Sequence, residues 1–545
     1  MSTTALAQGS DEAADGVTGV RRAVGTFALS LATFMAVLDI SIANVSIPAI
    51  AGDLGVSPSQ GTWIITGFGV ATAISLPLTG WLVQRLGTVR LFAASVLLFT
   101  TASWLCGLAT SIESLVFFRV LQGAVGGPMI PLCQALVLRS YPRERLGYAF
   151  SVLAVTTLAA PIAGPLLGGW LTDNWSWRWV FLVNVPVGLI CAFVVWQVFR
   201  PLETAIRRVR VDVIGLGMLI VWVGSLQLML DLGKDRDWFG SALIVWLAIS
   251  AGVFFALFVV WELTDSNPVV DLSLFRLRNF WVGTAAMALA YSLFLGNLVL
   301  LPLWLQKYLG YTATLAGIVL APIGLLAVLA APIVGRYVGR HDPSWIVSGA
   351  FLVFALSLWM RSHFSTETDL QTMMLPSLIQ GAGNAMFFVP LLAMILSRLP
   401  PDRVAAAAGL SNFVRFSAGA IGTSLITTAW EWRASVHRSH LLEGLHDGAQ
   451  PLIQARETLA SAGLGPGQQI AFVDRLVEQQ AHTLAATDLF YGSAILFMAL
   501  VALVWWARWE KPVEISQPAT HSPSARTLAV QSVHPVHSQS ATPPA

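Results

Sequence analysis

The stretch VLQGAVGGPMIPL (Val120–Leu132) recurs in altered form as LIQGAGNAMFFVPL (Leu378–Leu391), with Gln-Gly-Ala followed by Pro-Leu in both. A second pair, GWLVQRLG (Gly80–Gly87) and GRYVGRHD (Gly335–Asp342), shares a Gly followed five residues later by an Arg. Each match alone is weak. Both pairs, however, are eight apolar segments apart, and a shared offset indicates a duplicated helical unit. The sequence therefore predicts two six-helix halves with two further helices inserted between them.

The composition is that of a membrane protein. Apolar residues make up 56% of the 545 residues and charged residues 11%, whereas soluble domains carry about 25% charge. A helix needs about 20 mainly apolar residues to cross the bilayer. Fourteen segments qualify: 24–49, 61–83, 89–109, 115–138, 147–171, 179–199, 213–233, 241–263, 281–305, 313–337, 345–360, 372–397, 405–430 and 488–507. The predicted fold class is an all-α membrane protein with 14 transmembrane helices.

The distribution of basic residues predicts the orientation. Most of the 31 lysines and arginines fall in loops that are cytoplasmic if the N-terminus is inside, as the positive-inside rule requires. We therefore expect a multi-pass membrane protein with both termini in the cytoplasm and no cleaved signal peptide. The predicted regions are a cytoplasmic N-tail (1–22), an N-terminal half (23–200), the inserted pair with its linkers (201–279), a C-terminal half (280–511) with a periplasmic segment (431–487), and a disordered tail (512–545).

Several function classes are disfavoured by residue usage. The three cysteines are isolated in apolar runs and the nine histidines fall in loops or the tail, so no metal site is predicted. A formal net charge of +2 with scattered basic residues gives no reason to expect a nucleic-acid partner. The sequence has no phosphate-binding loop of the Walker type. We expect a protein that is not an enzyme, needs no cofactor, and draws energy from an ion gradient or from another subunit.

One carboxylate is embedded in the first apolar segment. In LDISIANVSIP (Leu38–Pro48), Asp39 is the only charge between Ala23 and Gly52, and it lies about 15 Å from the outer end of its helix. An aspartate at this depth costs about 2.5–3.5 kcal/mol on insertion scales and normally faces a cavity or a partner. Burial disfavours the charged carboxylate and a nearby cation favours it. Asp39 is therefore a candidate proton carrier, and the alternative is a fixed structural ion pair.

Two arginines also fall inside predicted spans. Arg119 lies about 8 Å from the outer end of its helix and is expected to hold or orient Asp39, unless its side chain extends to the interface. Arg415 lies about 16 Å inside its helix with no acid in the second half. With Asp39 ionised the intramembrane charge is +1, which favours anionic or weakly acidic lipophiles. Arg415 is either a cavity-facing substrate residue or a structural one, and the second-half position that matches Arg119 is Ser377.

Four further side chains in spans are candidates for lining a ligand cavity, with core packing as the alternative: Gln122, Tyr291, Asn297 and Phe388. The segment APIAGPLLGG (Ala160–Gly169) predicts close helix packing through Gly164, Gly168 and Gly169. It also predicts bends at Pro161 and Pro165, where freed carbonyl groups need new partners.

These motifs resemble those of the major facilitator superfamily, and within it the fourteen-span drug:proton antiporters of the EmrB/QacA type. GWLVQRLGTVR resembles the loop motif, RVLQG the fourth-helix motif, and APIAGPLLGG the antiporter motif of helix five. The resemblance implies gating roles for Gly80, Arg85, Gly87, Arg90 and Gly123. It also implies that the antiporter motif limits leakage. One departure is Gln84, which stands where the loop motif usually carries an acid, so a gating salt bridge through that acid cannot be carried over.

The resemblance implies proton-coupled efflux of lipophilic, often acidic drugs and toxins by alternating access. It also implies a location in the bacterial inner membrane, with a periplasmic membrane-fusion adaptor and an outer-membrane channel as partners. The external segment shows two helical stretches, at 451–462 and 468–486, separated by GLGPG. Ile470, Val473, Leu476 and Val477 form an apolar stripe in the second, which needs the pore, the bilayer interface or an adaptor to pack against. A narrow-specificity metabolite or siderophore exporter and a non-transporting scaffold or sensor are the alternative functions.

Overall fold

The computed structural model describes Val17 and residues 19–506, with gaps at 143–144, 207–211, 234–235, 266–267, 339–341, 397–398, 401, 444 and 446–449. All regular elements in this part of the chain are helical. The first half holds α2 (Gly19–Asp53), α3 (Pro58–Gly61), α4 (Trp63–Ser75), α5 (Thr79–Leu86), α6 (Thr88–Gly107), α7 (Ile112–Gly126), α8 (Met129–Ser140), α9 (Leu146–Asn174), α10 (Trp179–Leu182), α11 (Asn184–Phe199) and the 3-10 turn η2 (Arg200–Leu202).

The inserted pair and the second half follow. They comprise α12 (Val213–Gly233), η4 (Trp238–Gly240), α13 (Ala242–Thr264), η5 (Leu272–Arg276), α14 (Arg278–Lys307), α15 (Ala313–Val338), α16 (Pro343–Arg361), α17 (Leu370–Leu396), α18 (Val404–Glu443), α19 (Gln450–Ser461) and α20 (Pro466–Val504). The predicted tail at 512–545 and the first 16 residues lie outside the described part of the chain.

The helices match the predicted spans. Twelve helical segments among the described residues are long and apolar enough to cross a membrane, and the pair α4 and α5, bent by 64°, makes a thirteenth. The bend falls at Leu76–Leu78, where Pro77 lacks the N–H that a continuous helix needs. Helix α9, of 29 residues, covers the remaining predicted span. The all-helical membrane fold is confirmed, and its helices are consistent with fourteen spans.

The two halves repeat the same helix pairings. In the first half α2 packs on α9 and α11, α7 packs on α4 and α6, and α6 packs on α11. In the second half α14 packs on α18 and α20, α17 packs on α15 and α16, and α16 packs on α20. Counted as spans, each half pairs its first helix with its fifth and sixth, its fourth with its second and third, and its third with its sixth. The duplication predicted from two short motifs therefore extends to these five helix pairings, whereas the close packing of α18 on α20 is not matched by α9 and α11.

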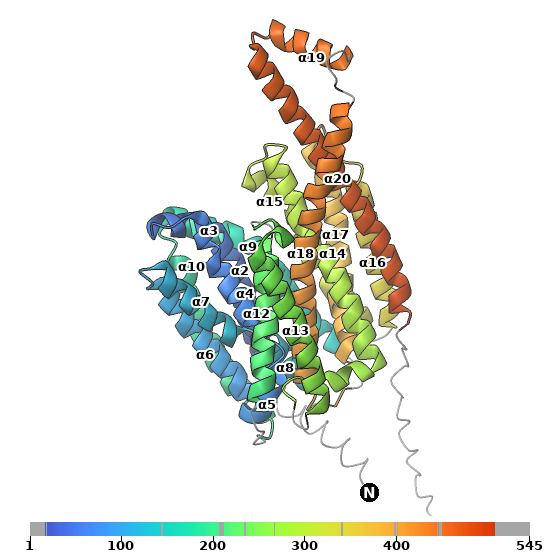
Figure 1. Ribbon diagram of the computed structural model, residues 1–545. Coiled ribbons are helices and arrows are strands. Elements are labelled where there is room, and N and C mark those ends of the chain that lie inside the picture. Colours follow the sequence, from blue (N-terminus) through green and yellow to red (C-terminus); the bar gives the residue numbers. More distant parts are fainter. Residues whose placement is uncertain are drawn as a thin grey trace, which may run out of the picture. The chain divides into compact units, whose positions relative to one another are not determined.

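The inserted pair stands at the edge of the bundle. Helices α12 and α13 pack on each other, and α12 also contacts α4 of the first half and α18 of the second (Figure 1). Only 22% of the most apolar window of α12 and 17% of that of α13 are buried, against 61% for α2. Since their apolar side chains have few protein neighbours, most of the surface of these helices suits lipid. The pair thus covers the seam between the halves on one side.

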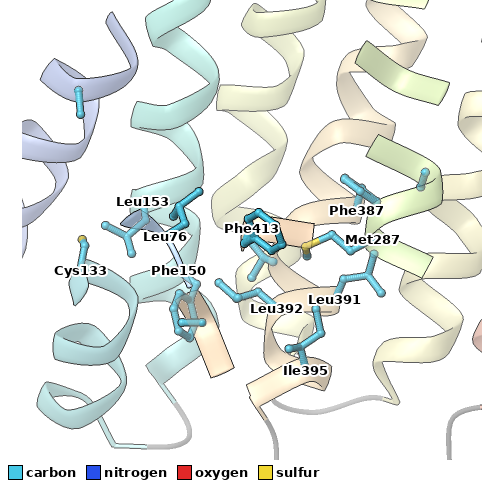
Figure 2. Close-up of a cluster of buried hydrophobic side chains, with 14 of the residues drawn as sticks. Leu76, Cys133, Phe150, Leu153, Met287, Phe387, Leu391, Leu392, Ile395 and Phe413 are labelled. Atoms are coloured by element: carbon cyan, nitrogen blue, oxygen red, sulfur yellow. The ribbon is translucent and has the colours of Figure 1, made fainter. Parts of the chain in front are cut away.

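The halves meet along α9 and α15, and also at the end of the bundle that carries α5, where α18 packs on α5 and α8. A methyl group added at Gly409 of α18 would lie 2.6 Å from the carbonyl oxygen of Leu76, and one at Gly80 would lie 2.8 Å from the Cα of Ala406. Asn412 donates a 2.9 Å hydrogen bond to Gln134 across the halves. Beside this contact lies a cluster of buried apolar side chains from both halves, including Leu76, Cys133, Phe150, Leu153, Met287, Phe387, Leu391, Leu392, Ile395 and Phe413 (Figure 2). We call this cluster the seal, because it closes the α5 end of the bundle.

The opposite end of the bundle carries α19 and the extensions of α18 and α20, which we call the external helices because the sequence predicts this segment to lie outside the cytoplasm. The predicted helix at 451–462 is α19, and GLGPG separates it from α20 as expected. Two boundaries differ from prediction: α18 continues to Glu443 instead of ending near 430, and α20 runs unbroken from Pro466 into the last span. The extensions of α18 and α20 carry α19 away from the bundle (Figure 1), and Arg438 binds Asp474 between them at 2.6 Å.

Candidate functional site

Asp39 lies at the centre of a polar cluster inside the first half. Its side chain, on α2, is completely buried. One carboxylate oxygen accepts a short hydrogen bond from Nη1 of Arg119 on α7. The other accepts hydrogen bonds from Gln122 at 3.1 Å and from Asn184 of α11 at 2.7 Å. The carboxylate is thus held by donors from two neighbouring helices.

Arg119 is fixed from several sides. Its Nε donates to the carbonyl oxygen of Ile64 at 3.2 Å, and Nη1 also donates to Gln122 at 2.8 Å. The guanidinium lies over Phe68, 4.2 Å from the ring centroid, and 5.6 Å from that of Phe181. Since Arg119 and Gln122 are three residues apart, α7 presents both on one face. The guanidinium lies in the protein interior and does not extend to the interface.

The chemistry of this pair follows from its burial. Inside the protein two opposite charges attract strongly, but each has lost its hydration. An ionised carboxylate only accepts hydrogen bonds, whereas a protonated one is also a donor. Protonation of Asp39 would therefore weaken its contacts with Arg119, Gln122 and Asn184 together. The arrangement can couple the uptake of one proton to a movement of α2 relative to α7 and α11.

Two members of the cluster were not anticipated. Asn184 stands at the start of α11, a mainly apolar helix, and Ser103 of α6 accepts a 3.0 Å hydrogen bond from it. Both side chains are buried. A single Asn in the segment 179–199 was the available signal, but its partner in α2 is far away in sequence. Only the packing of α11 on α2 brings them together.

Arg415 occupies a second site, in the second half. It is buried, and its guanidinium lies 4.5 Å from the ring centroid of Phe416, 4.9 Å from that of Phe388 and 5.1 Å from that of Tyr291. Nη2 donates a 2.8 Å hydrogen bond to Asn412, while Nε has no partner. None of the ion pairs found among the described residues includes it. We call this arrangement of a cation among aromatic rings the arginine box.

The five candidate substrate residues do not form one cluster. Arg415, Tyr291 and Phe388 meet in the arginine box, but Gln122 belongs to the Asp39 cluster. Asn297 lies elsewhere: its amide donates to the carbonyl oxygen of Leu293 at 2.7 Å and to Ser493 of α20 at 3.0 Å. Asn297 thus joins α14 to α20 inside the second half, which is the packing role kept open as its alternative.

The loop motif joins α5 to α6 and is anchored by an acid from elsewhere. Gly87 has φ of +86°, a conformation that favours glycine. The carboxylate of Glu203, just after η2, accepts hydrogen bonds from the backbone N–H groups of Val89 at 3.0 Å and Arg90 at 2.9 Å. It therefore caps the first turn of α6, where a negative charge is favourable. The position at which this motif usually carries an acid is Gln84 in this chain, and Glu203 supplies a carboxylate to the same loop.

The other arginine and the glycines of the family motifs have local roles. Arg85 lies over the ring of Trp81 at 5.5 Å. A methyl group at Gly123 would clash with the carbonyl oxygen of Phe68, and one at Gly164 with Ser41. One at Gly168 would lie 2.9 Å from the carbonyl oxygen of Ile42, so both of these positions of α9 need glycine for close packing on α2. Gly169 has no neighbour within 4 Å; Pro161 and Pro165 lie in α9, but their side chains are outside the described part.

A further buried cation was not predicted. The eleventh predicted span, 345–360, ends before Arg361, yet Arg361 is the last residue of α16 and is fully buried. Nη2 donates to Ser377 at 3.1 Å and to Gln380 at 2.6 Å, whereas Nε and Nη1 have no partner. Ser377 and Gln380 are the positions that match Arg119 and Gln122 in the repeat. The guanidinium that binds Gln380 in the second half therefore comes from α16, and not from α17, the helix that matches α7.

Taken together, two repeated bundles around buried charges define a multi-pass membrane transporter. The profile of the Major Facilitator Superfamily matches residues 29–423. The chain is 47% identical over 493 residues to the multidrug export protein EmrB of Escherichia coli K12, covering 90% of this chain and 96% of that protein. It is 43% identical over 483 residues to the fatty acid resistance protein FarB of Neisseria gonorrhoeae, covering 89% and 95% respectively. The chain belongs to the major facilitator superfamily, among its EmrB-type drug transporters.

A solved structure supports the fold independently. The human organic anion transporter MFSD10 aligns with a TM-score of 0.56 at 14% sequence identity, covering 88% of this chain and all of that one. At this identity the likeness concerns the fold alone. Drug transporters of this superfamily are transporters and not enzymes, and they act on small molecules without a cofactor. The chain is a multi-pass protein of the inner membrane.

Proposed function

We propose that this protein exports lipophilic, weakly acidic drugs and toxins in exchange for protons, by alternating access. The single observation that carries the proposal is the Asp39 cluster. Its fully buried carboxylate accepts hydrogen bonds from Arg119, Gln122 and Asn184, and the strength of these hydrogen bonds depends on whether Asp39 is ionised. In the proposed cycle Asp39 takes up and releases the proton, and Arg119 stabilises its ionised form. The relatives named as multidrug exporters support the same activity.

The proton gradient supplies enough energy for this task. One proton moving through about 100 mV yields about 2.3 kcal/mol, and one unit of pH difference adds about 1.4 kcal/mol. At about 1.4 kcal/mol for each tenfold change in concentration, one proton per cycle supports about 500-fold accumulation of a neutral compound. A single titrating carboxylate such as Asp39 is therefore sufficient.

The arginine box supports the preference for acids. Arg415 is a buried cation without an acidic partner among the described residues, so an anionic group nearby would relieve its desolvation. Three aromatic rings surround the guanidinium and suit the apolar body of a lipophile. One relative is named for resistance to fatty acids, which are lipophilic carboxylates. We infer that Arg415 attracts the acidic group of the substrate.

The exposed apolar side chains of the external helices support the proposal of a protein partner. Ile470, Phe472 and Leu476 of α20 are exposed on the extension beyond the bundle, and exposed apolar side chains gathered on one element are typical of an interaction surface. With both termini cytoplasmic, as the arrangement of basic residues favours, these helices stand in the periplasm. We propose that they bind a periplasmic adaptor, which connects the transporter to an outer-membrane channel.

The decisive experiment measures proton flux driven by substrate. Purified protein is reconstituted into proteoliposomes that contain a pH-sensitive dye. A lipophilic acid is then added so that its transport runs against its own concentration gradient. We expect Asp39→Asn to abolish coupled proton movement while substrate binding persists. The matched control is Asp53→Asn, on the same helix but half-exposed, which should transport normally. If Asp39→Asn exchanges protons as well as the unchanged protein, the proposed mechanism is wrong; if the unchanged protein moves neither substrate nor protons, a scaffold or sensor is the better interpretation.

A further inference from the structure

A hydrogen bond between the halves lies within the apolar seal. The side-chain amide of Asn412 on α18 donates to the side-chain oxygen of Gln134 on α8 at 2.9 Å. Both side chains are buried, with 2% and 3% of their surface exposed. Their chain neighbours Phe413 and Cys133 belong to the seal (Figure 2). We call the contact between Asn412 and Gln134 the latch, because it joins the halves at the closed end of the bundle.

The latch depends on the relative position of the two halves. Asn412 also donates to the carbonyl oxygen of Ala408 at 2.8 Å, but that bond lies within α18 and survives any movement of the whole helix. A hydrogen bond of this kind extends to about 3.2 Å, so the bond to Gln134 breaks when α18 moves away from α8. Buried amides are costly without partners. The latch therefore stabilises one closed arrangement of the halves, whereas apolar side chains can pack in several.

The arginine box fixes the direction of the latch. Nη2 of Arg415 donates to the side-chain oxygen of Asn412 at 2.8 Å. A guanidinium group can only donate hydrogen bonds, so it requires the oxygen of the amide to face it. The amide nitrogen then points toward Gln134 and donates. Asn412 thus connects the arginine box of the second half with a helix of the first.

The same helix of the first half leads to the Asp39 cluster. Helices α7 and α8 form one membrane span, Ile112–Ser140. Gln122 of α7 donates to Asp39 at 3.1 Å, and Gln134 follows it on the same span after about 18 Å of helix. Protonation of Asp39 weakens the contacts that hold α7, and a movement of α7 carries α8 with it. One span therefore joins the carboxylate to the latch.

We propose that Asn412 and Gln134 are positioning residues that couple the protonation state of Asp39 to closure of the α5 end. With Asp39 ionised, the span Ile112–Ser140 is held in place and the latch forms. With Asp39 protonated, the span is released and the latch opens. The inference rests on the proposed proton-coupled export and deepens it, because it supplies the connection between the proton site and alternating access.

The first test measures the reaction of Cys133 with a maleimide, by mass spectrometry, on the full-length protein in lipid nanodiscs. Asn412→Leu and Gln134→Leu should each accelerate it by about two- to twelvefold, the range of a net hydrogen bond. Asn412→Asp should react as slowly as the unchanged protein, since a carboxyl group can bond the Gln134 amide in either protonation state. Gln134→Leu leaves the bond between Arg415 and Asn412 in place. An unchanged rate in Gln134→Leu, or a fast one in Asn412→Asp, would overturn the latch.

Two controls come from the chain itself. Ser411 is buried beside Asn412, and its hydroxyl donates to Ala408 of its own helix at 3.2 Å. Ser411→Ala removes a buried polar group of α18 that does not bond across the halves, so it should leave the Cys133 rate unchanged. Cys191 of α11 is also buried and should keep its rate in every variant. Equal acceleration in Ser411→Ala, or of Cys191, would assign the effect to general loosening and contradict the latch.

The second test asks whether Asp39 acts through the latch. Asp39→Asn gives a side chain that is neutral, like the protonated acid, and should accelerate Cys133. Adding Asn412→Leu to Asp39→Asn should then accelerate it little further, because the latch is already open. Distant residues without a shared partner normally have additive effects on free energy, so their rate factors would multiply. Multiplying factors would refute the coupling between Asp39 and Asn412.

The labelling readout separates this inference from the proposed function, because it requires neither substrate nor a proton gradient. Loss of proton exchange in the unchanged protein, with rate factors that do not multiply, would refute only the proposed export mechanism. Intact proton-coupled transport with multiplying factors would refute only the role of Asn412 and Gln134.

Discussion

Arg361 donates a hydrogen bond of 2.6 Å to Gln380, as Arg119 donates one of 2.8 Å to Gln122 at the matching position of the other half. The two glutamines are repeat-related, but the arginines come from different helices, α7 and α16. The second difference is the acid: Asp39 neutralises Arg119, whereas no ion pair among the described residues includes Arg361. The duplicated unit has kept a buried guanidinium–amide contact in both halves and a carboxylate in one.

This asymmetry predicts that replacing Arg119 and replacing Arg361 have different effects on the stability of the protein. Arg119→Met leaves the Asp39 charge buried without its cation, which should destabilise the protein by about 3–5 kcal/mol. Arg361→Met removes a buried cation that has no acidic partner, so the gain from losing an unpaired charge should offset the lost hydrogen bonds. We expect thermal unfolding in detergent to show a large decrease in Tm for Arg119→Met and little change or an increase for Arg361→Met. Equal losses would mean that Arg361 is also neutralised.

The close contact of α18 with the first half predicts a way to open the seal. Gly409→Val would force a side chain against the carbonyl oxygen of Leu76, where even one methyl group would lie at 2.6 Å. Overpacking costs about 1–3 kcal/mol, and such an energy shifts a two-state equilibrium by about 5- to 150-fold. The closed form should lose population. Cys133, a buried thiol of the seal, should then react faster with a maleimide, measured by mass spectrometry.

The chain contains its own references for this experiment. Cys106 and Cys191 are buried elsewhere in the first half and should react at unchanged rates. Gly69 of α4 has no neighbour within 4 Å, so Gly69→Val is the matched control. Unchanged labelling of Cys133 in Gly409→Val would show that this crossing does not hold the α5 end closed.

The success and failure of sequence prediction have physical reasons. Asp39 and Arg119 were predictable because a charge inside an apolar segment is expensive and needs a partner. Arg361 was missed because it ends its helix, where hydropathy does not distinguish a loop from a buried position. Glu262 was also missed: it lies within a predicted span, is buried at the end of α13, and accepts a hydrogen bond from the backbone N–H of Val270 at 3.2 Å.

Packing between distant segments was the other limit. The repeat predicted that the halves would have matching helices, since both motifs had the same offset. It did not predict that Glu203 would replace the acid absent at Gln84, because the two belong to different loops. The apolar pocket lined by Pro77, Trp222 and Phe413 likewise depends on α12 packing between α4 and α18, which no local pattern encodes.

The cap on α6 predicts that Glu203 contributes more to stability than Arg90, with which it forms an ion pair. Glu203 accepts two backbone N–H groups, whereas its contact with the Arg90 side chain spans 3.9 Å and that side chain is 57% exposed. Loss of a helix cap costs about 0.5–2 kcal/mol, and an exposed ion pair contributes no more than about 1 kcal/mol. We expect Glu203→Ala to lower the Tm in detergent clearly and Arg90→Ala to change it little. Comparable losses in both variants would assign the stability to the ion pair.

The external helices predict a separable defect in assembly. Leu476 is exposed on α20 and lies on the extension beyond the bundle, far from the Asp39 cluster in sequence. Leu476→Glu should therefore weaken association with the proposed periplasmic adaptor, because a buried unpaired carboxylate at the proposed contact is costly. Proton-coupled transport in proteoliposomes, which contain no adaptor, should be unchanged. Copurification from cell envelopes and the vesicle assay measure the two properties separately.

The control for this prediction lies two residues away. Glu478→Gln alters an exposed residue on the same helix while adding no charge, and it should leave both association and transport intact. If Leu476→Glu instead abolishes transport in vesicles, the extension acts on the pore. If Leu476→Glu leaves copurification as strong as in the unchanged protein, this part of α20 does not contribute to an adaptor interface, and the exposed side chains of α19 would be the next surface to change.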